Sequence, residues 1–191
     1  MPYDRNCADR TNSFALVSYI PEPLAGFLNR LRQELVPNCK LRAHITALPP
    51  RPLTAAPEAA WDQILRDLSG ISPFEIELTS IQVFPVSDVI YLAAGAGADE
   101  LRAMHRKLNH GNVRFVEPFR YRPHVTLAQN LDTGRVDEIK ELAAARWAAF
   151  PHSRRFRVER LTFVQNTLEN TWADLHECDL TAGHNCDLVL R

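Results

Sequence analysis

The sequence has no excess of charge of either sign. Lysine and arginine together number 22 and aspartate and glutamate 23, so the net charge at pH 7 is −1. A protein that coats nucleic acid or an anionic membrane through its overall field carries a large positive charge. We therefore expect neither a DNA duplex nor a membrane as a partner, and any affinity for phosphate must come from arginines that gather locally.

Long hydrophobic runs are also missing. No segment approaches the roughly 18–20 consecutive apolar residues that a membrane-spanning helix needs, and the charged N-terminus lacks the apolar core of a signal peptide. The four cysteines, Cys7, Cys39, Cys178 and Cys186, form no CxxC pair and no zinc-ribbon spacing. We expect free thiols and a cytoplasmic location.

Sequence signatures of bound cofactors are absent as well. The chain has no glycine-rich phosphate loop and no G-K-[ST] motif, so nothing supports ligation driven by a nucleotide cofactor. The H-x-C pairs His176–Cys178 and His184–Cys186 offer zinc-type ligands, but they lie in a short polar tail. We expect no metal and no cofactor.

What the sequence does contain is the same order of elements twice. Hydrophobic periodicity predicts strand, helix, strand and helix at 14–20, 24–35, 41–48 and 61–68, and again at 89–93, 101–108, 121–129 and 136–147. The strand predicted at 41–48 is expected to end at Pro49 and Pro50. Three further strands are predicted at 74–84, 156–165 and 172–180.

These elements predict an α+β fold of two similar lobes. Two antiparallel sheets are expected to face a central cleft, with the helices outside. We expect residues 1–12 to form a flexible tail and residues 13–191 a single bilobal domain. Lobe one would span about 13–70 and lobe two about 89–150, with the remaining strands completing the sheets.

The second strand of each half carries nearly the same five residues. Residues 42–46 read RAHIT, and residues 122–126 read RPHVT. Because side chains alternate between the two faces of a strand, arginine, histidine and threonine share one face and the apolar residues share the other. The sequence thus predicts a polar stripe on an apolar backing, twice.

These residue types suit phosphodiester chemistry. In-line attack at phosphorus needs a base on the attacking oxygen and an acid on the leaving oxygen, and the imidazoles of His44 and His124 titrate near neutral pH. The hydroxyls of Thr46 and Thr126 can donate hydrogen bonds to the non-bridging oxygens. One H-x-T motif is uninformative, but two in equivalent strands, each with arginine at the same offset, indicate a paired site.

Other residues are candidates for substrate binding. Arg42 and Arg122 lie on the motif face and could bind phosphate, or they could be solvated at a strand edge. Tyr19, Phe84 and Trp172 could stack on a nucleotide base, although aromatic residues on strands are usually part of the core. Most other basic groups near the motifs are expected at the surface: Arg51, Arg114, Arg120 and, in a helix, His105.

The twin motif resembles that of the 2H phosphoesterase superfamily. HITAL at 44–48 and HVTLA at 124–128 are similar to its paired H-Φ-T-Φ motifs, and the chain most resembles the bacterial 2'-5' RNA ligase (LigT-like) family over most of 13–180. The resemblance implies a bilobal fold and metal-independent opening of 2',3'-cyclic phosphates to 2'-phosphates. A possible further reaction is 2'-5' RNA ligation, which joins a 2',3'-cyclic end to a 5'-hydroxyl and is the reverse of 2'-5' cleavage. It also implies catalytic and phosphate-binding roles, respectively, for His44 and His124 and for Thr46 and Thr126.

One departure from the family and several alternatives stay open. Many relatives have a basic residue just after the second motif, where this chain has Gln129 and Asn130. We expect a monomer whose partner is a nucleotide or RNA end with a cyclic phosphate. The alternatives are a non-catalytic module that binds RNA ends, and a hydrolase of 2'-5' oligonucleotides or nucleotide-sugar cyclic phosphates.

Overall fold

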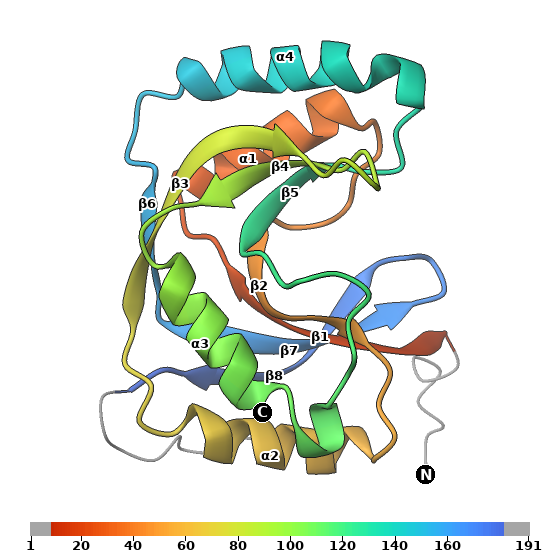
Figure 1. Cartoon of the computed structure of the whole chain (residues 1–191), viewed down its shortest axis with the longest axis vertical. Helices are drawn as coiled ribbons and strands as arrows, with labels where there is room; N and C mark the ends of the chain where they lie inside the picture. Colours follow the sequence, from red (N-terminus) through yellow and green to blue (C-terminus); the bar gives the residue numbers. More distant parts are fainter. Residues whose placement is uncertain (1–8, 182–191) are drawn as a thin grey trace, which may run out of the picture.

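The computed structural model describes residues 9–181, which form two four-stranded sheets and four α-helices (Figure 1). The elements in chain order are β1 (Arg10–Tyr19), α1 (Leu24–Leu35), β2 (His44–Arg51), α2 (Pro57–Leu68), β3 (Phe74–Val83), β4 (Ile90–Ala94), α3 (Ala98–Leu108), β5 (His124–Ala128), α4 (Val136–Ala148), β6 (Arg155–Val158), β7 (Arg160–Thr167) and β8 (Trp172–Asp179). Short 3-10 helices lie at Gly111–Val113 and Thr133–Arg135. The predicted α+β class is confirmed.

The two sheets have matching places for the motif strands. The first sheet has the order β2-β1-β7-β8 and the second β5-β4-β3-β6, and all their pairings are antiparallel. β2 and β5 therefore lie at the edges of their sheets. These two edges also contact each other, so the fold brings the two motifs together (Figure 1).

Each sheet is covered by helices from both halves of the sequence. α2 packs on the first sheet, where Trp61 stacks on Phe163, and α3 contacts β2. α4 packs on β3 of the second sheet, and α1 joins it there, with Phe27 against Trp147 (Figure 1). A lobe, meaning one sheet with its covering helices, thus combines segments from both sequence halves.

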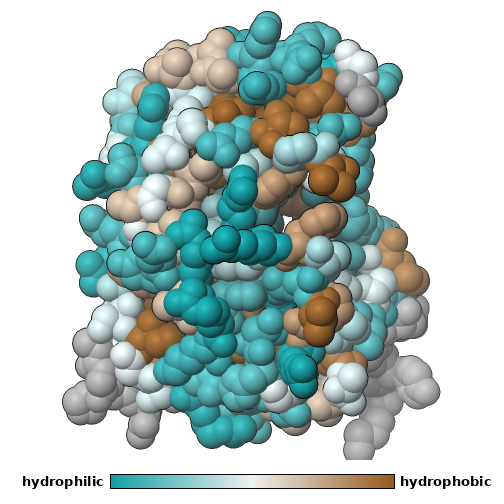
Figure 2. Space-filling view, viewed as in Figure 1, coloured by the Kyte–Doolittle hydropathy of each residue, from teal (hydrophilic) through white to brown (hydrophobic). Residues whose placement is uncertain are grey.

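One continuous apolar core joins the two lobes. The motif strands contribute the residues that alternate with the polar stripe: Ala43, Ile45 and Ala47 next to and within β2, and Val125 and Leu127 within β5 are all buried. This confirms the apolar backing predicted for each motif. On the face shown in Figure 2, hydrophilic side chains predominate and hydrophobic ones form separate small patches.

The predicted single strand 156–165 is wrong, because it is two strands in different sheets. β6 pairs with β3 and β7 pairs with β1, and Glu159 separates them. Val158 and Leu161 are both buried, so the apolar alternation shifts by one residue at the crossing. That shift was the available signal in the sequence.

Other strand limits also differ from the sequence prediction. β2 begins at His44 and continues through Pro49 and Pro50 to Arg51. An edge strand tolerates proline because one side of its backbone needs no ladder hydrogen bonds. β5 is shorter than predicted, and β1 begins at Arg10, within the segment expected as a tail.

The cysteines differ from the expectation of free thiols. Cys178 is disulfide-bonded, and Cys39 is a free thiol. Of the zinc-type ligands considered, His184 and Cys186 lie outside the described residues, and His176 stacks on Trp61. No helix in residues 9–181 is long and apolar enough to cross a membrane.

Candidate active site

A cleft of about 850 Å³, lined by residues of both sheets, brings together the candidate catalytic, phosphate-binding and base-stacking residues named from the sequence. Its volume lies in the range of about 300–1,000 Å³ typical of small-molecule sites. The residues predicted from the two motifs line it: Arg42, His44, Thr46, Arg122, His124 and Thr126. The three aromatic candidates line it too: Tyr19, Phe84 and Trp172.

The two motif strands hold their histidines in the same way. The His44 Nδ1 atom lies 2.7 Å from the carbonyl oxygen of Arg42, and the His124 Nδ1 atom lies 2.7 Å from that of Arg122. A carbonyl oxygen only accepts hydrogen bonds, so Nδ1 carries the hydrogen in both rings. Each Nε2 is then left with its lone pair, and it can accept a proton as a base or return one as an acid.

Burial lowers the pKa of both imidazoles. Loss of water around the ring is the main cause for His44, whose pKa falls to about 4 although its hydrogen bond to Arg42 acts in the opposite direction. The positive charges of Arg32 and His124 lower this pKa further, and burial also lowers the pKa of His124. Both rings are therefore mainly neutral at pH 7, and a phosphate oxyanion beside them would raise their pKa values.

The motif arginines lie at the surface of the cleft and have different partners. The Arg42 guanidinium carbon lies 3.5 Å from the ring centre of Tyr19, and its Nη1 donates to Asp174 at 3.2 Å. Arg122 Nη1 donates to the Tyr91 hydroxyl at 2.9 Å. The carboxylate of Asp174 partly neutralises the charge of Arg42, whereas the Tyr91 hydroxyl is neutral and leaves the charge of Arg122 unchanged. Arg122 therefore attracts a phosphate more strongly than Arg42 does.

Two of the aromatic candidates pack against the histidines. The ring centres of Tyr19 and His44 are 6.4 Å apart, and those of Phe84 and His124 are 5.0 Å apart, both with edge geometry. The Tyr19 hydroxyl also donates to Asp174. Trp172 is half-buried against the cleft face of the first sheet. These contacts give Tyr19 and Phe84 a role in holding the imidazoles, whatever else they bind.

A more exposed aromatic residue, Phe119, was not predicted from the sequence. It is 64% exposed and lines the cleft. An exposed ring is free to stack on a base in a way that a packed ring is not. Phe119 follows no strand pattern, because it lies in the connection between α3 and β5, and so no local signal in the sequence distinguishes it.

A buried ionic cluster beside the cleft corrects two expectations. Arg51 was predicted at the surface, but it is 2% exposed and its Nη2 donates to Glu117 Oε1 at 2.6 Å. His105 was also predicted at the surface, but it is buried and its Nε2 donates to the same oxygen at 2.8 Å. Arg114 and Arg120 are exposed, as expected. The cluster joins residues far apart in sequence, which is why local patterns did not indicate it.

The cluster also connects the two motifs. His105 stacks on Tyr121 with ring centres 4.1 Å apart. The Tyr121 hydroxyl in turn donates to the carbonyl oxygen of Thr46 at 2.6 Å. The residue before Arg122 in the second motif is thus bonded to the backbone of the first motif, which fixes the two strands relative to each other.

A known protein family matches the part of the chain that forms this site. The family model described as the 2'-5' RNA ligase superfamily matches residues 20–170, which include both motifs. The chain belongs to the 2'-5' RNA ligase superfamily. A Bacillus licheniformis protein named as a phosphoesterase is 29% identical over 121 residues, which cover 62% of this chain and 71% of that protein.

Solved structures share the fold of this 2'-5' RNA ligase superfamily member. Escherichia coli LigT in complex with 3'-AMP has a TM-score of 0.63 at 15% identity, covering 91% of this chain and 98% of that one. The protein TT0787 of Thermus thermophilus has a TM-score of 0.60 at 18% identity, covering 90% of this chain and 100% of that one. These likenesses establish the bilobal LigT-like fold predicted from the motifs.

Proposed function

We propose that this protein is a metal-independent phosphodiesterase that opens 2',3'-cyclic phosphates of nucleotides or RNA ends to 2'-phosphates. His44 and His124 act as the acid and base. The observation that carries the proposal is the matched pair of Nδ1–H bonds, which leaves the two Nε2 atoms as the proton-transfer groups of one cleft.

The reaction needs one protonated and one neutral ring. The neutral Nε2 takes a proton from water, whose oxygen attacks phosphorus, and the P–O3' bond breaks as the protonated Nε2 gives its proton to O3'. Thr46 and Thr126 donate hydrogen bonds to the non-bridging oxygens as charge builds there. With a 5'-hydroxyl in place of water, the same steps make a 2'-5' linkage.

Nucleotides as substrates are supported by the structural relatives and the cleft size. E. coli LigT has been solved with 3'-AMP, ATP and NADP+. The alternatives remain an RNA-end binding module without catalysis and an enzyme for 2'-5' oligonucleotides or nucleotide-sugar cyclic phosphates. The monomeric state and the cytoplasmic location stay predictions. Because Cys178 is disulfide-bonded, the expectation of free thiols no longer supports a cytoplasmic location.

The test is turnover of the four 2',3'-cyclic mononucleotides in EDTA, with products identified by chromatography. We expect 2'-phosphates, and a loss of kcat of about 10²-fold or more in both His44→Ala and His124→Ala because each removes an acid–base group. His152→Ala, at an exposed histidine, is the matched control. Binding of these nucleotides without turnover by the wild-type protein would favour the non-catalytic module.

A further inference from the structure

Arg32 is the one charged residue on the buried face of α1. It lies four residues after Leu28 on the apolar stripe of that helix, and it is 2% exposed. Its Nε and Nη1 atoms are buried without a hydrogen-bond partner among the described residues. A buried charge costs folding free energy unless it is paired, so this guanidinium is poised for a partner that the polypeptide of residues 9–181 does not supply.

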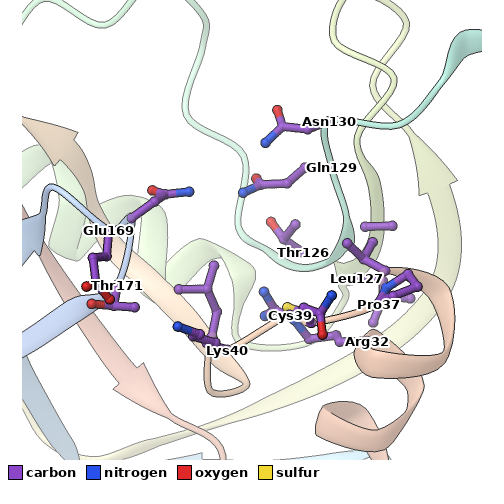
Figure 3. A pocket seen from close by; sticks show the side chains of 15 residues that line it. Arg32, Pro37, Cys39, Lys40, Thr126, Leu127, Gln129, Asn130, Glu169 and Thr171 are labelled. Atoms are coloured by element: carbon purple, nitrogen blue, oxygen red, sulfur yellow. The ribbon is translucent and has the colours of Figure 1, made fainter.

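The side chain of Arg32 reaches a small pocket beside the central cleft (Figure 3). This Arg32 pocket has a volume of about 280 Å³. Arg32, Lys40 and Thr126 line both the pocket and the cleft, so the two spaces adjoin. Thr126 belongs to the second motif, and a group in the Arg32 pocket would therefore lie next to a group held by that motif.

The lining of the Arg32 pocket suits an anion. Lys40 adds an exposed ammonium at its rim, and Gln129 and Asn130 add amide groups that can donate hydrogen bonds. The pocket also has one carboxylate, that of the exposed Glu169, on the far side from Arg32 (Figure 3). Guanidinium groups with free donors bind phosphate oxygens through charge-assisted hydrogen bonds.

We propose that the Arg32 pocket binds a second phosphate of the substrate, beside the cyclic phosphate at the histidines. The inference rests on the proposed function of the cleft and names its substrate class. The preferred substrate carries another phosphate close to the 2',3'-cyclic phosphate, as an RNA end or a 5'-phosphorylated nucleoside does. A cyclic mononucleotide without a second phosphate leaves Arg32 unpaired.

The first test measures binding of two product-like ligands by calorimetry, so it does not depend on turnover. A nucleoside 2',5'-bisphosphate should bind wild-type protein about tenfold or more tightly than the nucleoside 2'-phosphate, as expected for hydrogen bonds to a charged group. Arg32→Met should abolish that difference. Arg30→Met, at an exposed position of the same helix, should keep it.

The outcomes separate this proposal from the function of the cleft. Equal affinity of wild-type protein for both ligands, or equal weakening of both by Arg32→Met, overturns the second subsite. Binding that depends on Arg32 without any hydrolysis of cyclic phosphates overturns the proposed catalysis instead. Arg32→Met should fold at least as stably as wild type because it removes an unpaired buried charge. A second variant, Arg32→Lys, keeps the positive charge but lacks the planar hydrogen-bond donors of the guanidinium.

A kinetic comparison identifies the phosphate source. The ratio of kcat/KM values for a 5'-phosphorylated nucleoside 2',3'-cyclic phosphate and for its unphosphorylated form should exceed about ten, and Arg32→Met should bring it near one. A dinucleotide that ends in a cyclic phosphate presents a diester instead of a monoester. Whichever of the two gains more from Arg32 is the form that the pocket takes, and no gain for either contradicts the proposal.

Discussion

Arg42 and Arg122 occupy equivalent positions in the two motifs but have unequal surroundings. Asp174 pairs with Arg42 at 3.2 Å, whereas Arg122 bonds the neutral Tyr91 hydroxyl. The side chains can also be removed without disturbing the histidines, because the hydrogen bonds that orient the imidazoles go to the arginine backbone carbonyls.

We therefore expect Arg122→Ala to raise KM more than Arg42→Ala does. An exposed charge contributes about 0.2–1 kcal/mol, so the expected rise in KM for Arg122→Ala is roughly 1.4- to fivefold, with kcat little changed. Steady-state kinetics of both variants on the same cyclic nucleotide measure this. A larger effect at Arg42 would show that the ion pair with Asp174 opens when substrate binds.

The half-buried histidines make stability depend on pH in a defined direction. Burial lowers the pKa of His44 in the folded protein to about 4, while an unfolded histidine has a pKa of about 6.5. Between these values the unfolded chain binds more protons than the folded one, so stability is full above about pH 6.5 and is lost as the pH falls toward 4. The lowered pKa of His124 adds loss in the same direction.

The expected result is a melting temperature that falls from pH 7 to pH 4.5 less steeply in His44→Gln than in wild type. Thermal denaturation followed by circular dichroism gives the slopes. His152→Ala, which removes an exposed histidine, is the matched control. Parallel slopes for His44→Gln and wild type would mean that the ring is hydrated in solution.

At the scale of elements, the salt bridge of Arg51 with Glu117 fixes the connection between α3 and β5 against the end of β2. Glu117→Ala leaves the guanidinium of Arg51 buried without its carboxylate. We expect a loss of about 3–5 kcal/mol in the free energy of unfolding, measured by urea denaturation. Glu141→Ala, at an exposed site on α4, should change it by less than about 0.5 kcal/mol.

The double substitution Arg51→Met with Glu117→Leu tests the cause of that loss. Replacing both charges by apolar groups leaves no unpaired ion, so the double variant should be more stable than Glu117→Ala alone. If it is less stable, then the other hydrogen bonds of Arg51, to the Pro49 and Val113 carbonyls and to Asn109, carry most of the stabilisation.

The elements that carry local signals were predictable, and those that depend on distant partners were not. The motif strands were recognised because alternation and a repeated pentapeptide are visible in a short window. The pairing of Arg51 with Glu117 joins residues that no window contains together. The sequence does contain a signal for Arg32, because its charge interrupts the apolar stripe of α1. The pocket that Arg32 lines, however, is known only from the fold.

At the scale of the whole molecule, the order of strands and helices was predictable but the assignment of helices to sheets was not. Periodicity shows that α1 has an apolar face and does not show which sheet that face covers. In the structure α1 covers the second sheet and α3 contacts the first. A helix from each half of the sequence thus packs against a strand from the other half, and the apolar core is continuous between the lobes.

This interweaving predicts that the lobes unfold together. Trp61 is buried under the first sheet and Trp147 under the second, so fluorescence of each can report on its own lobe. In the variants Trp147→Phe and Trp61→Phe, each measured with Trp172→Phe, the urea transitions should be single and should coincide with the circular dichroism of the same variant. A fluorescence transition that precedes the loss of helical signal would show that one lobe opens alone.

The hydrogen bond from each imidazole to the carbonyl two residues before it makes each motif self-contained. The backbone of the pentapeptide itself sets the tautomer of its imidazole, and Tyr19 and Phe84, from outside the pentapeptides, pack against the two rings. If two such segments were placed on facing edge strands of an unrelated scaffold, they would present two imidazoles that each carry their hydrogen on Nδ1 and leave Nε2 free for proton transfer.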